Sequence, residues 1–130
     1  MNCVSDRGIG ALESDWTRYK YSVLERSQEG YDRIRALLRD KSAYPAQEMY
    51  RTIEESLGRP ATAGNADNAA QHVWGHVNGT ATEAERKRFR NALQDFASGR
   101  TDIWPVKNIL LKLAQKYWEE YLLNAYYLCL

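Results

Sequence analysis

The stretch TEAERKRFRNALQDFASG, residues 82–99, shows how this chain folds locally. Glu85 follows Thr82 by three positions, which is the spacing of a capping box: each side chain accepts a hydrogen bond from the other residue's backbone N–H. Gly99 then provides a residue that is suited to ending a helix. The stretch therefore predicts an amphipathic helix with one face directed to a core. Its apolar residues recur three or four positions apart and are Phe89, Ala92, Leu93 and Phe96.

Outward from this helix, glycines and prolines mark the ends of four more amphipathic segments. The first runs from about residue 14 to residue 40, with a kink predicted at Gly30. The second starts at Pro45 and ends at Gly58, which suits a left-handed helix cap. The third follows a candidate cap at Asn65, and the last starts near Pro105 and continues almost to residue 130. Because no segment alternates in polarity, we predict an all-α fold: a single compact bundle of about five helices.

Composition and charge set the broad class of protein. The 130 residues are 44% hydrophobic and 27% charged, and their net charge is +1. This balance is typical of one globular domain and excludes a strongly basic, histone-like binder. We expect a domain over residues 14–130, preceded by a flexible N-terminal segment over residues 1–13.

The sequence also indicates a compartment. No apolar run has the length of a membrane span or of a signal peptide, so we expect a cytoplasmic protein without a membrane partner. Cys3 and Cys129 are then expected to be free thiols, with a disulfide as the alternative if the two termini meet.

Three stretches share a pattern with a known family. WTRYKYSVLERSQEGY, residues 16–31, contains Trp-x-x-Tyr-Lys-Tyr and then Ser-x-x-x-Tyr. NAAQHVWGH, residues 68–76, contains Asn-x-x-x-His-x-x-Gly. SGRTDIWPVKNILLKL, residues 98–113, contains Gly-x-x-x-Ile-x-Pro and leads into YWEEYLLNAYYL, residues 117–128. In this order and spacing, the chain from residue 16 onward resembles the YbgA-like domains of bacteria and phages.

This resemblance implies an accessory role. YbgA-like domains occur alone and as the C-terminal part of proteins with a thiouracil or thiouridine desulfidase domain, which uses cysteine-bound iron–sulfur chemistry. Two cysteines are too few to hold such a cluster, so we expect no cofactor and no catalysis by this chain. The resemblance instead implies binding of structured RNA such as tRNA, beside a desulfidase or another RNA-modification partner.

Basic and polar residues predict where on the protein the RNA binds. If the first and last helices pack together, their basic residues form one track for RNA phosphates, beside tyrosines that suit stacked bases. The alternative is that the charged residues face solvent and that Asn68 and His72 make interhelical hydrogen bonds. We expect the basic run at residues 86–90 to be such a solvated helix face. The predicted RNA-binding residues are Lys20, Arg26, Asn68, His72, Lys107, Lys112 and Lys116.

Two further groups of residues support alternative functions. The aromatic residues of the last helix cannot all face inward, so an alternative function is protein interaction or homodimerisation through Trp118, Tyr121 and Tyr126. His72 and His76 have the spacing of two metal ligands, but no third ligand follows them, and we expect no metal site. A small enzyme that uses the polar residues around His72 is the least favoured alternative, because the sequence contains no activated nucleophile.

Overall fold

The computed structural model of the chain describes residues 2–129, with side chains from Gly8 onward. Within residues 2–129 there is no β-strand, which confirms the all-α prediction. The expected number of about five helices is too low, because two of the expected helices are each divided. The elements are α1 (Asn2–Leu24), α2 (Gln28–Leu37), α3 (Ala46–Leu57), α4 (Ala63–Trp74), α5 (Glu83–Ala97), α6 (Trp104–Lys116), α7 (Glu120–Leu123) and a 3-10 turn, η1 (Tyr126–Leu128).

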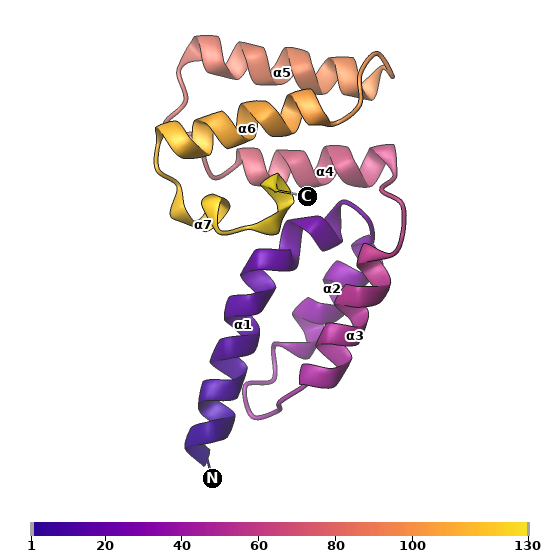
Figure 1. The fold of residues 1–130 in the computed structure, drawn as a ribbon, viewed down its shortest axis with the longest axis vertical. Coiled ribbons are helices and arrows are strands. Elements are labelled where there is room, and N and C mark those ends of the chain that lie inside the picture. Colours follow the sequence, from indigo (N-terminus) through magenta and orange to yellow (C-terminus); the bar gives the residue numbers. More distant parts are fainter. Residues whose placement is uncertain (1, 130) are drawn as a thin grey trace.

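The helices form a bundle with two ends (Figure 1). Helices α1, α2 and α3 pack together at one end, and α4, α6 and α5 lie side by side at the other. Helix α4 and turn η1 connect the two ends, because both pack against α1 as well as α6. One contiguous hydrophobic core runs through both ends and includes Leu24, Ile34, Met49, Val73 and Leu110. None of the helices between residues 2 and 129 is long and apolar enough to cross a membrane.

The predicted first helix is two helices, with the break at residues 25–27 rather than a kink at Gly30. Ser27 has extended backbone and its hydroxyl accepts a hydrogen bond from the N–H of Gly30, so Ser27 caps the start of α2. Gly30 is needed for a different reason, since a Cβ at this position would overlap Oγ of Ser56 on α3. The glycine therefore lets α2 and α3 approach closely.

The segment over residues 1–13, which we expect to be flexible, includes the start of helix α1. Helix α1 begins at Asn2 rather than near Ser14. Ile9 and Leu12 are buried in the core, at 7% and 1% exposure. From Gly8 onward this segment is therefore part of a packed helix.

The predicted last helix is also divided. Helix α6 begins at Trp104, with Pro105 in its first turn as expected, but it ends at Lys116. Trp118 then has a left-handed backbone with φ 49°, which turns the chain away from the helix axis. The short helix α7 and the turn η1 follow, and they return Tyr127 and Leu128 to the core.

The helix caps test the local predictions directly. The capping box is confirmed: Thr82 N–H donates to Glu85 Oε1 at 2.8 Å, and Glu85 N–H donates to Thr82 Oγ1 at 3.2 Å. Helix α4 is capped by Thr62, whose hydroxyl accepts from the N–H of Asn65, so Asn65 is not the cap. Gly58 has φ −78° and is not left-handed. Cys129 is exposed and free, and the expected alternative of a disulfide lies outside the described side chains because it involves Cys3.

Candidate nucleic-acid interface

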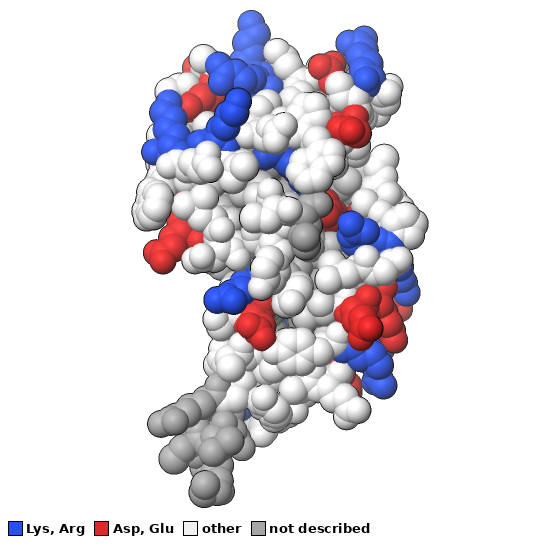
Figure 2. All heavy atoms as spheres, in the orientation of Figure 1, with Lys and Arg blue, Asp and Glu red and all other residues white. Residues whose placement is uncertain are grey.

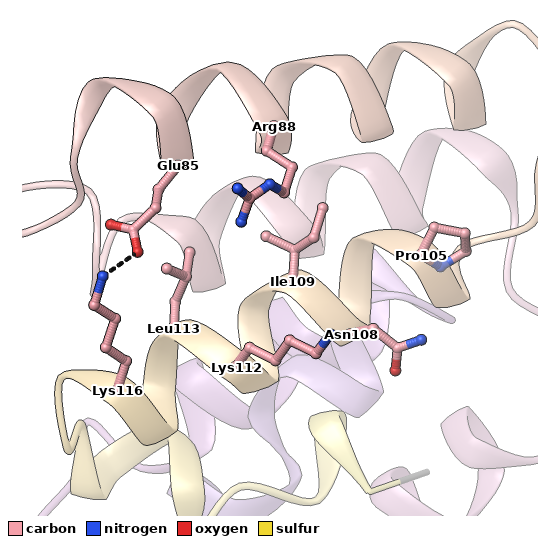
Figure 3. A pocket seen from close by; sticks show the side chains of 8 residues that line it. All are labelled: Glu85, Arg88, Pro105, Asn108, Ile109, Lys112, Leu113 and Lys116. Atoms are coloured by element: carbon pink, nitrogen blue, oxygen red, sulfur yellow. Dashed lines mark hydrogen bonds and ion pairs between the residues drawn. The ribbon is translucent and has the colours of Figure 1, made fainter.

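A groove of about 530 Å³ lies between α5 and α6. We call it the basic groove, because Arg88, Lys112 and Lys116 line it against one carboxylate, Glu85. Figure 3 shows Arg88 extending from α5 toward α6, while Lys112 and Asn108 extend along α6. Its remaining lining is apolar and consists of Pro105, Ile109 and Leu113.

The surroundings of the groove are also basic. Figure 2 shows Lys and Arg side chains gathered over the end of the molecule that α5 and α6 form. Among the described residues, Arg88 and Lys112 make no ion pair, so their charges are available to an external anion. With a net charge of +1 for the whole chain, attraction to a polyanion must come from such a local cluster.

Glu85 closes one end of the groove and ties the two helices together. Its carboxylate accepts hydrogen bonds from Lys116 Nζ at 2.8 Å and from the Tyr117 hydroxyl at 2.6 Å. It also accepts the N–H of Thr82 in the capping box. The bond from Lys116, with those from Thr82 and Tyr117, lowers the pKa of Glu85 to about 2, and the Glu85 carboxylate raises the pKa of Lys116. Both groups are therefore charged across the physiological pH range.

Lys107 does not belong to the surface track that the sequence predicts. Its side chain is 3% exposed and forms an ion pair with Glu25, which is 5% exposed, at 3.1 Å. The ammonium group also lies 4.2 Å from the ring centroid of Tyr127. A lysine held in this way cannot reach an RNA phosphate, so its prediction as an RNA-binding residue is corrected.

Lys20 and Arg26 lie apart from the basic groove. The predicted last helix does pack on the first, but through η1, its C-terminal part, whereas α6, which carries Lys112 and Lys116, packs against α5. Lys20 is half-buried on α1 over the ring of Tyr21, and burial lowers its pKa. Arg26 donates to the carbonyl oxygen of Arg59 at 2.8 Å. Of the five predicted basic residues, the structure thus brings together Lys112 and Lys116 in the groove.

Asn68 and His72 lie on α4, away from the groove lining. The amide of Asn68 donates to Oε1 of Gln28 at 3.3 Å, which joins α4 to α2 in the interhelical role that we gave as the alternative. The His72 side chain is exposed. These two residues therefore do not extend the basic groove.

His76 is separated from His72 because α4 ends between them, at Trp74. Its ring stacks on Tyr121 with centroids 4.9 Å apart, and Nε2 lies 2.7 Å from the hydroxyl of Tyr21. Burial lowers the pKa of His76, so the neutral imidazole is favoured. Among the described residues, no three His, Cys, Asp or Glu side chains are placed to hold a metal ion.

The three predicted interface residues have different environments. Trp118 is 75% exposed, the largest exposure of any large hydrophobic side chain in the described part of the chain. Tyr121 is half-buried against His76, and Tyr126 packs on Tyr19 with ring centroids 4.9 Å apart. Tyr121 and Tyr126 are therefore partly covered by aromatic neighbours, and Trp118 is the most exposed of the three.

Arg88 and the full role of Glu85 are not predicted by the sequence pattern. The run at residues 86–90 is expected to be a solvated face, yet Arg88 lines the groove. A signal was present: the capping box fixes the orientation of Glu85, and a residue three positions later lies on the same helix face. The link from Glu85 to Lys116 depends on the packing of α5 against α6, for which the sequence gives no local signal.

Comparison with known proteins shows the family of the chain. A family model described as "Protein of unknown function (DUF1722)" matches residues 20–130. No curated protein and no solved structure matches the chain. The matched range contains both helices of the basic groove and most of the 130 residues. The chain therefore belongs to the DUF1722 family.

Proposed function

We propose that this protein is a non-catalytic accessory domain of the YbgA-like type that binds structured RNA, such as tRNA, through the basic groove. The observation that carries the proposal is the convergence of Arg88, Lys112 and Lys116 on one groove between two helices. Cationic side chains bind RNA phosphates, and arginine can contact two phosphate oxygens at once. The apolar lining, with Ile109 and Leu113, suits contact with ribose and base surfaces.

The test is a titration of fluorescently labelled tRNA at two salt concentrations, followed by anisotropy. The groove variant Arg88→Ala/Lys112→Ala removes the two cations that have no ion pair among the described residues. We expect weaker binding and a shallower dependence of log affinity on log salt, by about 0.7–0.9 per lost phosphate contact.

The matched control is Arg33→Ala/Arg51→Ala, which removes the same number of charges from exposed positions on α2 and α3. It should keep the wild-type salt dependence. The proposal is wrong if the wild type does not bind tRNA, or if the groove variant and the control change the salt dependence equally.

A role in protein interaction is the second candidate, because the ring of Trp118 is 75% exposed. The partner in that case is a second copy of the chain or a desulfidase or other RNA-modification protein. Light scattering over a range of concentrations tests self-association: a mass that rises with concentration, together with no tRNA binding, favours this candidate over the first.

A further inference from the structure

Trp118 occupies a backbone position that normally belongs to glycine. It follows the last turn of α6 in a Schellman motif, in which Glu119 N–H donates to the carbonyl of Ala114 at 2.9 Å and Trp118 N–H donates to that of Gln115 at 3.4 Å. Its φ of 49° is left-handed. This conformation is disfavoured for residues with a Cβ, and for a bulky side chain it is an outlier that requires an explanation.

The chain itself provides the comparison. Helix α5 ends in the same motif, with Arg100 N–H donating to Asp95 O at 2.9 Å and Gly99 N–H donating to Phe96 O at 3.1 Å. The left-handed residue there is Gly99, with φ 80°. The ends of α5 and α6 therefore have the same backbone geometry. The left-handed position is occupied by glycine, which it favours, at the end of α5 and by tryptophan at the end of α6.

Packing inside the protein does not explain Trp118. Trp16 is buried at 7% exposure, and Trp74 stacks on Phe89 with centroids 4.3 Å apart, so those rings stabilise the core. The Trp118 ring is 75% exposed and gains little from burial. A strained backbone that holds a solvent-exposed ring indicates that the ring serves a contact outside this chain.

The location of Trp118 identifies the chemistry of that contact. It lies two residues after Lys116, at the end of α6 where Lys116 lines the basic groove. Proteins hold single-stranded nucleic acid by combining a cationic groove with exposed aromatic side chains, with phosphates on the cations and bases stacked on the rings. We propose that Trp118 stacks on an unpaired base of the RNA whose phosphates occupy the basic groove, an inference that rests on the proposed function.

A protein partner fits this surface less well. A stable protein interface buries about 1,200 Å² or more in total, whereas one aromatic side chain contributes about 150–250 Å². Tyr121 and Tyr126 are each half-buried against an aromatic neighbour, so they offer less apolar surface than Trp118. One exposed ring, two residues after a lysine of the basic groove, matches a nucleobase, which needs one flat apolar face.

The test compares two labelled RNAs: a stem-loop with an unpaired purine loop, and a blunt duplex of the same stem. Trp118→Gly removes the ring and supplies the residue that the left-handed position favours. We expect this variant to bind the stem-loop roughly tenfold more weakly, within the range measured for base–aromatic stacking. Its duplex affinity and its salt dependence should match the wild type, because no charge is removed, and its thermal stability should be equal or higher.

Three controls separate stacking from other effects. Trp118→Phe should retain most stem-loop affinity, whereas Trp118→Leu, which keeps an apolar side chain without a ring, should lose it. Tyr44→Ala removes an aromatic side chain that is 56% exposed, between α2 and α3 and away from the groove, and should leave affinity unchanged.

The outcomes distinguish this inference from the function on which it rests. Salt-dependent binding of the stem-loop that is equal in wild type and Trp118→Gly overturns the stacking role and leaves the groove proposal in place. Failure of the wild type to bind either RNA overturns both. A mass in light scattering that falls in Trp118→Gly, with unchanged RNA affinity, shows that the ring binds protein instead.

Discussion

Lys107 and Glu25 form an ion pair that is almost completely removed from water. Loss of one partner leaves the other as an uncompensated buried charge, which costs about 3–5 kcal/mol in known cases. We expect Lys107→Ala to lower the free energy of unfolding by about this amount, measured by urea denaturation.

The control for this prediction is Lys112→Ala on the exposed face of the same helix, which should change stability by less than about 0.5 kcal/mol. The double variant Glu25→Gln/Lys107→Met removes both charges and should recover much of the loss. Equal effects of Lys107→Ala and Lys112→Ala would contradict the buried position of the pair.

Gly30 is the residue on which the close approach of α2 and α3 depends. Alanine favours helices over glycine by about 1 kcal/mol, but a Cβ here overlaps Ser56 Oγ and lies 3.2 Å from Ser27 Oγ. We expect Gly30→Ala to destabilise the protein by about 1–3 kcal/mol, as overpacking does, in the same denaturation assay.

Gly64 is the matched control, because it also lies in a helix but a Cβ there meets nothing within 4 Å. Gly64→Ala should therefore stabilise the protein by about 0.5–1 kcal/mol. Adding Ser56→Ala to Gly30→Ala should restore part of the lost stability. A stabilised Gly30→Ala variant would show that the two helices are further apart.

At the scale of elements, the clearest end signals predict helix boundaries and weaker ones do not. The capping box of Thr82 and Glu85 predicts the start of α5, whereas the break at which Ser27 caps α2 is not predicted. The end of α6 could not be predicted in this way, because no glycine or proline stands there. Trp118 takes the left-handed position against its own local preference.

Glu85 connects α5 to α6, and its ionisation makes this connection sensitive to acid. Its pKa is about 2 in the folded protein, below its ordinary value of 4.5, so the folded state favours the carboxylate. The resulting stabilisation is fully present above pH 4.5 and is lost as the pH falls toward 2. We expect the melting temperature of the wild type to fall more steeply over this pH interval than the melting temperature of Glu85→Gln.

Glu83 serves as the control, since it lies in the same first turn but is 78% exposed. Glu83→Gln should keep the wild-type acid profile, measured as melting temperature against pH by circular dichroism. Parallel profiles for the wild type and Glu85→Gln would show that Glu85 is not held by Lys116 and Tyr117 in solution.

At the scale of the whole molecule, the predicted RNA-binding site agrees with the structure less well than the predicted helices do. Residues four positions apart are neighbours on the surface of a helix, so the sequence places Lys112 and Lys116 together on α6. Both line the groove. Periodicity does not say which helices are neighbours. The first helix does pack on the C-terminal part of the predicted last helix, at η1, but Lys112 and Lys116 lie on α6, where α5 packs and supplies Arg88 instead of Lys20.

The pair of Glu25 and Lys107 also bears on how the chain folds as it is synthesised. The two residues are 82 positions apart, so the ribosome releases the first helices long before the lysine is made. Until Lys107 is made, the Glu25 carboxylate has no cation to pair with, so its burial is unfavourable and it stays hydrated. The surface around Glu25 consequently stays open to water until Lys107 has been made. We therefore expect the fold to be completed only after the C-terminal third of the chain has been synthesised.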